Sequence, residues 1–326
     1  MSLVFSSKAG TLMDLREVSK TAKIPPLEIF TVSEWTSDRS GCLMRAVANL
    51  KTKLWIVRSS CSLEDQKISS NAGAFLSKVN VTRDDLGSAI DQVIASYGDA
   101  KPTDEVLLQP MLNNVLRSGV AFSHDPNTCS PYRTINWSEG SDTSMITAGK
   151  GGKVWQQAAL SKVQTPTGLD PVVRMIQEML VLFDFEPVDC EFAITNENGS
   201  EVLWLLQVRP LILSAPRQSD NNQFYILNSI ASKIKQGMQP QPFLLSERTV
   251  YGVMPDWNPA EMIGIRPKPL ALSLYKDLIT DSIWAYQRHN YGYRNLRSFP
   301  LMQDFHGLPY IDVRLSFNSF VPADLN

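Results

Sequence analysis

The chain has 326 residues, of which 43% are hydrophobic, and a formal net charge of −2. This length predicts one large domain or two ordinary ones with an ample core. The small net charge gives no reason to expect a nucleic acid as a partner, and the apolar runs are far too short to span a bilayer. No charged segment followed by an apolar one marks a secretory signal, so we expect a cytoplasmic protein without a membrane partner.

Cysteine usage favours the same compartment. The four cysteines lie far apart and form no C-x-x-C pair, which indicates reduced thiols and neither a disulfide framework nor a zinc site. The three histidines are isolated from one another and from the cysteines, so we interpret them as surface or satisfied core residues. These residues are Cys42, Cys61, Cys129, Cys190, His124, His289 and His306.

The first part of the chain carries a cation at the end of an apolar run. Lys8 precedes a short helical pattern, and residues 40–50 have helical spacing. The apolar run at residues 54–57 predicts a buried strand that ends at Arg58 and Ser59. Arginine forks onto phosphate oxygens and hydroxyls donate further hydrogen bonds, so the end of this strand suits a phosphate-bearing ligand.

A loop of small residues follows this strand. Glu64 and Asp65 lie at its start, and Gly73 lets the backbone approach a ligand that a side chain would exclude. A cation, hydroxyls, carboxylates and a flexible loop within one short span suit a triphosphate with its metal. The alternative is an ordinary surface loop after a buried strand.

Strands and helices follow through the middle of the chain. Residues 78–81 predict a strand, and residues 84–98 predict a helix whose apolar stripe belongs to the core. The runs at 105–112 and 118–123 predict two strands of one hairpin, joined by Asn113-Asn114.

A second group of polar residues lies further along the chain. Alternation places Asp189 and Glu191 on one face of a strand, and Gln207 and Arg209 on one face of the next. An antiparallel hairpin with a five-residue turn puts all four on the same face, and a slip of one residue breaks this. Two carboxylates and an amide oxygen suit Mg²⁺, with Arg209 neutralising a phosphoryl group. The alternative is a solvated polar face.

These segments resemble a known family in their order and spacing. They read VRSSCSLEDQKISSNAGAF from residue 57, VLLQPM from residue 106, DCEF from residue 189 and LQVRP from residue 206. They are similar to the nucleotide-binding signatures of phosphoenolpyruvate synthase and pyruvate phosphate dikinase. A later segment, NPAEMIGIRP from residue 258, is similar to rifampin-phosphotransferase-like members.

The resemblance implies an ATP-grasp fold that binds ATP and Mg²⁺. It implies that Arg58 and Arg209 are catalytic and that Asp189, Glu191 and Gln207 hold the metal. The nucleotide would be bound by the following residues: Lys8, Arg58, Ser59, Gly73, Leu108, Gln109, Met111, Gln207 and Arg209.

The expected fold class is α+β, with two subdomains of mainly antiparallel sheets followed by a partly helical second domain. We expect an ATP-grasp domain at residues 1–213, with subdomains of about 1–102 and 103–213. A polar linker at 214–223 leads to the start of an acceptor-substrate domain at 224–326.

The expected function is the ATP-binding, phosphoryl-donating portion of a dikinase or phosphotransferase. The family's mobile phosphohistidine motif does not occur in the sequence. We therefore expect a fragment or a reduced member, whose small-molecule acceptor is reached through a phosphohistidine domain outside this chain. Two alternatives are a non-catalytic nucleotide-binding module and an ATP-grasp ligase that activates a carboxylate.

Overall fold

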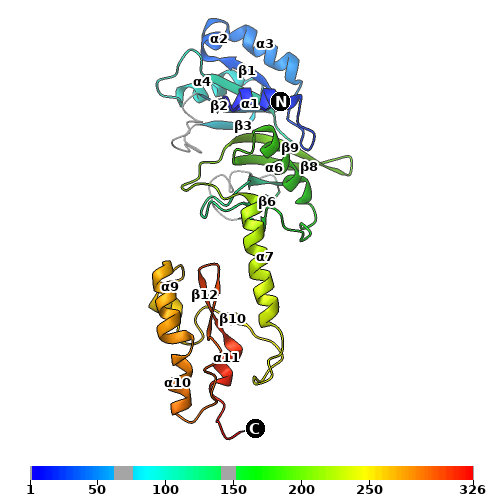
Figure 1. The fold of residues 1–326 in the computed structure, drawn as a ribbon. Helices are drawn as coiled ribbons and strands as arrows, with labels where there is room; N and C mark the ends of the chain where they lie inside the picture. Colours follow the sequence, from blue (N-terminus) through cyan, green and yellow to red (C-terminus); the bar gives the residue numbers. More distant parts are fainter. Residues whose placement is uncertain (1, 62–75, 141–151, 326) are drawn as a thin grey trace. The chain divides into compact units, whose positions relative to one another are not determined.

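The computed structural model of the protein describes residues 2–61, 76–140 and 152–325. The chain divides by its contacts into two compact units, Met1–Gln223 and Phe224–Asn326. Two antiparallel sheets form the frame of the first unit, and a three-stranded antiparallel sheet lies in the second (Figure 1). The expected fold class, α+β with mainly antiparallel sheets and a partly helical last part, is confirmed.

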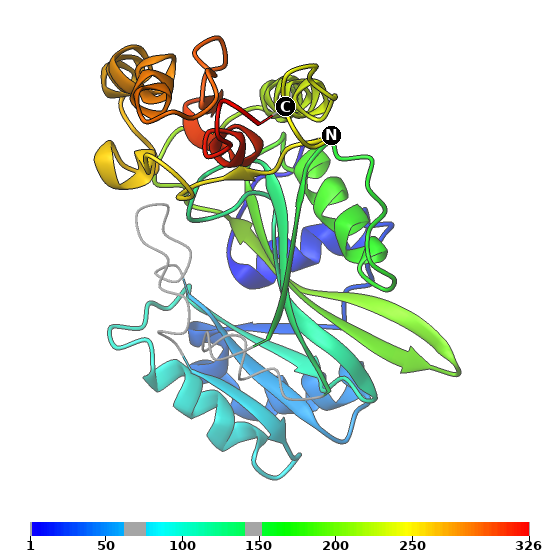
Figure 2. The same ribbon diagram turned by 90° about the horizontal axis from the view of Figure 1, so that it is seen from below.

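The first sheet has four strands in the order β1-β4-β2-β3. Its outer face is covered by two amphipathic helices, which follow the apolar stripes expected at residues 40–50 and 84–98 (Figure 2). Its strands and helices are β1 (Glu28–Thr31), α2 (Val32–Ser37), α3 (Arg39–Leu50), β2 (Trp55–Ser60), β3 (Ser77–Val81), α4 (Leu86–Ala95) and β4 (Glu105–Pro110).

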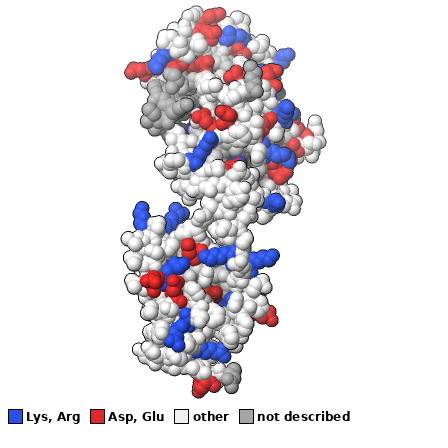
Figure 3. All heavy atoms as spheres, in the orientation of Figure 1, with Lys and Arg blue, Asp and Glu red and all other residues white. Residues whose placement is uncertain are grey.

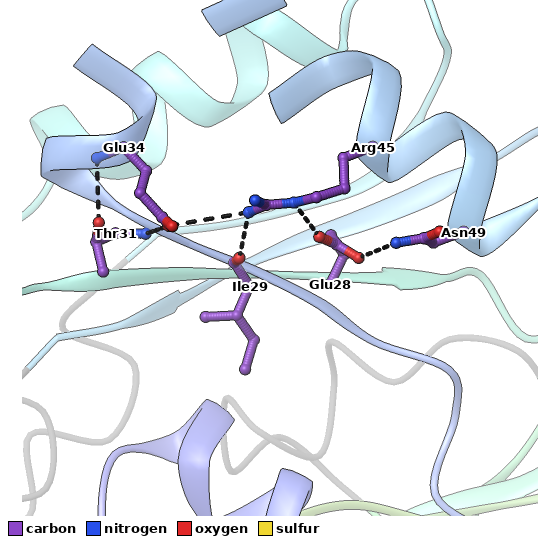
Figure 4. A network of polar contacts seen from close by, with 6 residues as sticks. All are labelled: Glu28, Ile29, Thr31, Glu34, Arg45 and Asn49. Carbon is purple, nitrogen blue, oxygen red and sulfur yellow. Dashed lines mark hydrogen bonds and ion pairs between the residues drawn. The ribbon is translucent and has the colours of Figure 1, made fainter. Parts of the chain in front are cut away.

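The outer edge of this sheet is closed by side chains of α3 (Figure 4). Arg45 donates its Nε to Glu28 at 2.5 Å and its Nη2 to the carbonyl of Ile29 at 3.2 Å. Asn49 donates to the other oxygen of Glu28 at 2.8 Å. Because an edge strand with free backbone groups can pair with another chain, these contacts protect β1.

The second sheet has five strands in the order β7-β6-β5-β8-β9. Helix α6 and helix α1 contribute to a core on one of its faces, with Leu12, Met175, Cys190 and Phe192 almost fully buried (Figure 2). The bounds of its elements are α1 (Lys8–Arg16), β5 (Val115–Phe122), β6 (Tyr132–Glu139), β7 (Lys153–Ala158), α6 (Asp170–Leu182), β8 (Val188–Glu197) and β9 (Ser200–Pro210).

The expected hairpin between residues 105–112 and 118–123 is wrong. Strand β4 pairs with β1 and β2, whereas β5 pairs with β6 and β8 in the other sheet. The connection through Asn113 and Asn114 therefore leads the chain from one sheet to the other. Alternation shows that a run is a strand, but it does not show which strand lies beside it.

The second unit contains helices and a small three-stranded sheet, with the strand order β10-β12-β11. Residues 269–290 do not form one continuous helix, because a π-helical turn and two further residues separate α9 from α10. Helix α7 (Asp220–Gly237) begins in the last residues of the first unit and continues into the second. The other elements of the second unit are β10 (Tyr251–Gly252), α8 (Pro259–Met262), α9 (Pro269–Tyr275), η1 (Lys276–Thr280), α10 (Ile283–Asn290), β11 (Met302–Phe305), β12 (Leu308–Asp312) and α11 (Val313–Asn318).

Helix α7 begins at Asp220, inside the segment 214–223 that we expected to be a linker. Arg133, which is 2% exposed, donates to Asp220 at 3.0 Å. A buried guanidinium needs a partner, so this ion pair holds the first turn of α7. Within the described ranges, none of the helices has the length and apolar character that crossing a membrane requires.

Candidate functional site

The hairpin of β8 and β9 brings together the four polar residues expected on one face. Asp189 lies opposite Arg209, and Glu191 lies opposite Gln207. The turn is shorter than expected, because only two residues, Asn198 and Gly199, separate the strands. The pairing of these residues depends on a feature that the sequence does not show.

That feature is a β-bulge at Leu206. From the turn to Phe192 and Leu205 the strands pair regularly, and the register then shifts by one residue. Without this shift Leu206 would lie opposite Glu191, and Gln207 would point to the other face. An extra residue in one strand restores the alternation, so Gln207 and Arg209 lie on the face of Asp189 and Glu191.

Arg58 joins the two sheets at this bulge. It lies near the end of β2, is 8% exposed, and donates Nη1 to the carbonyl of Leu206 at 2.8 Å. Its Nη2 donates to Glu191 at 2.6 Å and to the amide oxygen of Gln207 at 3.2 Å. The guanidinium therefore uses a backbone carbonyl of the bulge, a carboxylate and an amide of the hairpin at once.

A second ion pair lies next to the first on the same hairpin. Arg209 donates Nε and Nη2 to one oxygen of Asp189 at 2.8 and 2.6 Å. Asp189 is 6% exposed and Gln207 is 4% exposed. Two arginines and two carboxylates are thus held in a largely buried, charge-balanced cluster, in which the side chains of Arg209 and Glu191 are 20% and 23% exposed. We call it the paired-charge cluster: Arg58, Asp189, Glu191, Gln207 and Arg209.

The two carboxylates of this cluster have opposite pKa shifts. Burial alone raises the pKa of Glu191, but the positive charges of Arg58 and Lys8 outweigh burial and lower the pKa overall. Burial also raises the pKa of Asp189, and Arg209 offsets this only in part. Glu191 is therefore the stronger acid of the two relative to its ordinary value.

Lys8 is placed beside this cluster by the first helix. It is the first residue of α1 and is 5% exposed, and its charge contributes to the lowered pKa of Glu191. Ser7 caps the helix by accepting from the backbone N–H of Gly10 at 3.1 Å. The three cations predicted to bind phosphate, Lys8, Arg58 and Arg209, are thus associated with one hairpin.

The residues predicted to flank adenine are divided between two faces of β4. Gln109 lies opposite Ile56 and shares the face of Arg58, of which it is a diagonal neighbour. Leu108 is fully buried in the opposite core, beneath α3 and α4, so its side chain does not reach the face of Gln109. Met111 lies beyond the end of β4 and donates its backbone N–H to the carbonyl of Leu54.

Other predicted residues lie away from the cluster or outside the described residues. Ser59 is 1% exposed, and the alternation of β2 turns it away from Arg58 toward the core. Gly73, together with Glu64 and Asp65, lies outside the described residues. The sequence did not point to Leu206, which forms the bulge, because no residue type marks a bulge here. It did not point to Glu105 either, because this residue lies in a run that reads as an ordinary strand.

The donor set suits a magnesium ion that is shared with phosphates. Within residues 2–61, 76–140 and 152–325, no group of three or more His, Cys, Asp or Glu could hold a metal by itself. Mg²⁺ usually takes one or two carboxylates together with phosphate and water. Asp189 and Glu191, with the amide oxygen of Gln207, match this requirement.

An amide on the same face as Arg58 has an unused donor. Gln109 is 2% exposed, and its Nε2 has no hydrogen-bond partner among the described residues. A buried donor without a partner is costly. A ligand that offers an acceptor here, as a purine ring does, would satisfy it.

The exposed surface shows no concentration of one charge on the side drawn in Figure 3. Lys and Arg alternate with Asp and Glu over the first unit in this view. The distribution agrees with the net charge of −2. The charges that matter for the site are therefore the buried ones of the paired-charge cluster.

Comparisons with known proteins are weak. No protein-family model matches the chain, and no curated protein matches it. Solved structures with similarity include a D-alanine-D-alanine ligase from Helicobacter pylori, with 15% identity, a TM-score of 0.38 and coverage of 64% of this chain and 56% of that one. The match spans little more than half of the ligase.

Two further structures are similar at the same level. An acetyl-coenzyme A synthetase from Ca. Korarchaeum cryptofilum has 10% identity and a TM-score of 0.39, with coverage of 64% of this chain and 93% of that one. An L-amino acid ligase from Bacillus licheniformis has 11% identity and a TM-score of 0.33, with coverage of 68% and 43%. These scores carry no argument about activity, so the function is inferred from the residues of the site.

Proposed function

We propose that the first unit is an ATP-grasp-type module that binds MgATP at the paired-charge cluster and activates the γ-phosphoryl group. The observation that supports this most is the contact of Arg58 with Glu191 and Gln207 across the two sheets. It unites a phosphate-binding residue type with metal-binding residue types in one buried place.

In this proposal the cluster exchanges partners when the nucleotide binds. Arg58 and Arg209 would release the carboxylates of Glu191 and Asp189 to bind phosphate oxygens, and the two carboxylates would then hold Mg²⁺. The ion pairs keep the four charges neutral and oriented while the site is empty of nucleotide, because an unpaired buried charge is destabilising. Magnesium supplies charge neutralisation on the phosphates, and the protein contributes positioning.

The nucleotide base is assigned to the face of β4 that carries Gln109. The free Nε2 of this side chain would donate to a ring nitrogen of the purine, and Met111 directly follows β4 in the chain. Arg58 lies about 7–8 Å from Gln109 as a diagonal neighbour in the sheet. This spacing separates the base from the phosphates in the order that ATP requires.

Two reaction types remain distinguishable by their products. In an ATP-grasp ligase, a carboxylate oxygen of the substrate attacks the γ-phosphorus, the bond to the bridging oxygen breaks, and ADP leaves. In a dikinase, a phosphohistidine domain outside this chain receives a pyrophosphoryl group and AMP leaves. The residues of the paired-charge cluster fit both reactions, so the products decide between them.

The test is calorimetric titration of MgATP into the whole chain and into two variants, Glu191→Gln and Arg209→Met. We expect binding in the micromolar to millimolar range that needs Mg²⁺ and weakens at least tenfold in each variant, which is about 1.4 kcal/mol. A matched control is Arg174→Met, which removes an exposed arginine paired with Asp170 on α6.

The variants must be folded for this test to be decisive, which urea unfolding shows. Absence of MgATP binding by the folded wild-type chain would overturn the proposal. Phosphorus NMR with a panel of carboxylic acids and amines then tests the ligase, because acceptor-dependent release of ADP and phosphate indicates it. Binding without turnover would rule out the ligase for these acceptors and fits both the non-catalytic module and a dikinase portion whose phosphohistidine domain lies outside this chain.

A further inference from the structure

A carboxylate outside the paired-charge cluster ties together the two segments that carry Lys8 and Arg58. Glu105 is the first residue of β4, directly opposite Ser60 at the end of β2. Its Oε2 accepts from the hydroxyl of Ser7 at 2.5 Å and from that of Ser60 at 3.4 Å. A hydroxyl bound to a carboxylate at such a short distance is a strong, charge-assisted hydrogen bond.

The contacts of Glu105 bracket Lys8 in the chain. Ser7 precedes Lys8 and caps α1, while the backbone N–H of Ala9 donates to the hydroxyl of Ser60 at 3.0 Å. Ser60 is 1% exposed. Both neighbours of Lys8 are therefore held, directly or through Ser60, by one carboxylate of β4.

The backbone of Glu105 is held as well. Tyr97, which is 4% exposed and follows α4, donates its hydroxyl to the carbonyl of Glu105 at 2.7 Å. The N–H of Ser60 donates to the same hydroxyl at 3.3 Å. The result is a connected network from α1 through β2 and β4 to the end of α4, so the position of Glu105 does not depend on Lys8.

We infer that Glu105 is a positioning residue that sets the place of Lys8 at the nucleotide phosphates. The inference rests on the proposed function. Glu105 contacts neither the phosphates nor the metal in this scheme; it acts by holding the first turn of α1 against the ends of β2 and β4. The contribution of Lys8 to the lowered pKa of Glu191 agrees with the position that this network imposes.

The test compares MgATP affinity in the whole chain, in Glu105→Ala and in Glu105→Gln, each with and without Lys8→Met. Loss of a hydrogen bond to a charged group predicts a roughly tenfold weakening in Glu105→Ala. Glu105→Gln keeps an acceptor oxygen and restores most of the affinity. With Lys8→Met present, Glu105→Ala should change the affinity less than twofold, because its effect passes through Lys8.

A matched control uses the carboxylate at the other end of α1. Glu178 accepts from the backbone N–H groups of Lys20 and Thr21 at 2.8 and 3.0 Å. Glu178→Ala loosens the segment after α1, and we expect it to leave the MgATP affinity within twofold. Equal weakening by Glu105→Ala in the wild-type and Lys8→Met backgrounds, or no weakening in either, would overturn the inference.

Hydrogen exchange separates this inference from the proposed function. Without nucleotide, Glu105→Ala should speed amide exchange at residues 7–12 at least tenfold over the wild-type chain. Exchange limited by unfolding of the whole chain should not accelerate by the same factor. If the wild-type chain does not bind MgATP, the proposed function fails, while accelerated exchange still supports the tethering of α1. Unchanged exchange at residues 7–12 would refute the tether itself.

Discussion

Arg58 and Glu191 are 133 residues apart in the chain, yet the guanidinium Nη2 of one lies 2.6 Å from a carboxylate oxygen of the other. The pair joins the four-stranded sheet to the five-stranded sheet. Their side chains are 10% and 23% exposed, so the pair is largely shielded from water. Removing one partner leaves the other charge unpaired in a largely buried place, which is destabilising.

The first prediction concerns the stability of this pair. Arg58→Met should lower the free energy of unfolding by about 3 kcal/mol, and Glu191→Gln should lower it less, because Glu191 is more exposed. The free energy lost by the double variant should be smaller than the sum of the two single losses, and the difference should be about 1–3 kcal/mol. Urea unfolding measures all three. Lys153→Gln, which breaks an exposed pair with Glu139, serves as control with a change within about 0.5 kcal/mol.

The second prediction concerns the bulge. Deleting Leu206 leaves Glu191 opposite Gln207, but it removes the carbonyl to which Arg58 donates. We expect a loss of about 1–3 kcal/mol, the cost of an unmet hydrogen bond at a buried charged group. The same deletion in the Arg58→Met background should cost much less. Equal losses in the two backgrounds would show that the bulge does not act through Arg58.

The third prediction concerns acid stability and His124. This histidine is 4% exposed, and burial together with the nearby Arg133 lowers its pKa from 6.5 to about 4. Its Nδ1 lies 3.0 Å from the hydroxyl of Ser123, and the folded state holds it neutral. The unfolded chain therefore binds an extra proton as the pH falls below 6.5, so stability is lost between pH 6.5 and 4.

The size of this loss is about 3 kcal/mol for the shift given by that pKa. His124→Asn keeps a polar group at the position of Nδ1 and cannot be protonated. Between pH 6.5 and 4, the unfolding free energy of this variant should therefore fall by about 3 kcal/mol less than that of the wild-type chain. Chemical denaturation at several pH values measures this, and an NMR titration of His124 checks the pKa directly. A folded-state pKa near 6.5 would contradict the prediction.

The fourth prediction uses two glycines in opposite settings. A Cβ at Gly119 of β5 would lie 2.1 Å from the backbone oxygen of Asn136 in β6, whereas a Cβ at Gly87 of α4 would meet its nearest atom at 3.8 Å. Gly119→Ala should cost about 2–4 kcal/mol, because the strands must separate. Gly87→Ala should gain about 0.5–1 kcal/mol, because alanine favours a helix. Thermal unfolding compares both, and a neutral Gly119→Ala would show that β5 and β6 adjust freely.

The sequence predicted much of the local structure of the first unit. The helical stripes of α3 and α4 follow from the spacing of apolar residues. The separation of Asp189 and Glu191 from Cys190 likewise follows from strand alternation. The same alternation divides Gln109 from Leu108 on β4, although the sequence reasoning had grouped both as neighbours of adenine.

The partners of the strands were decided only by the tertiary structure. Strands β4 and β5 are neighbours in the chain but belong to different sheets. Leu108 of β4 packs in the core with α3 and α4, whereas Ala121 of β5 packs in the core with α6. The register of Gln207 against Glu191 depends on a bulge that also supplies a carbonyl to Arg58. Side chains alternate along a strand, so the sequence of one strand shows which of its residues share a face. Which strands pair, and in which register, depends on contacts between segments that are distant in the chain. Those contacts exist only in the folded protein.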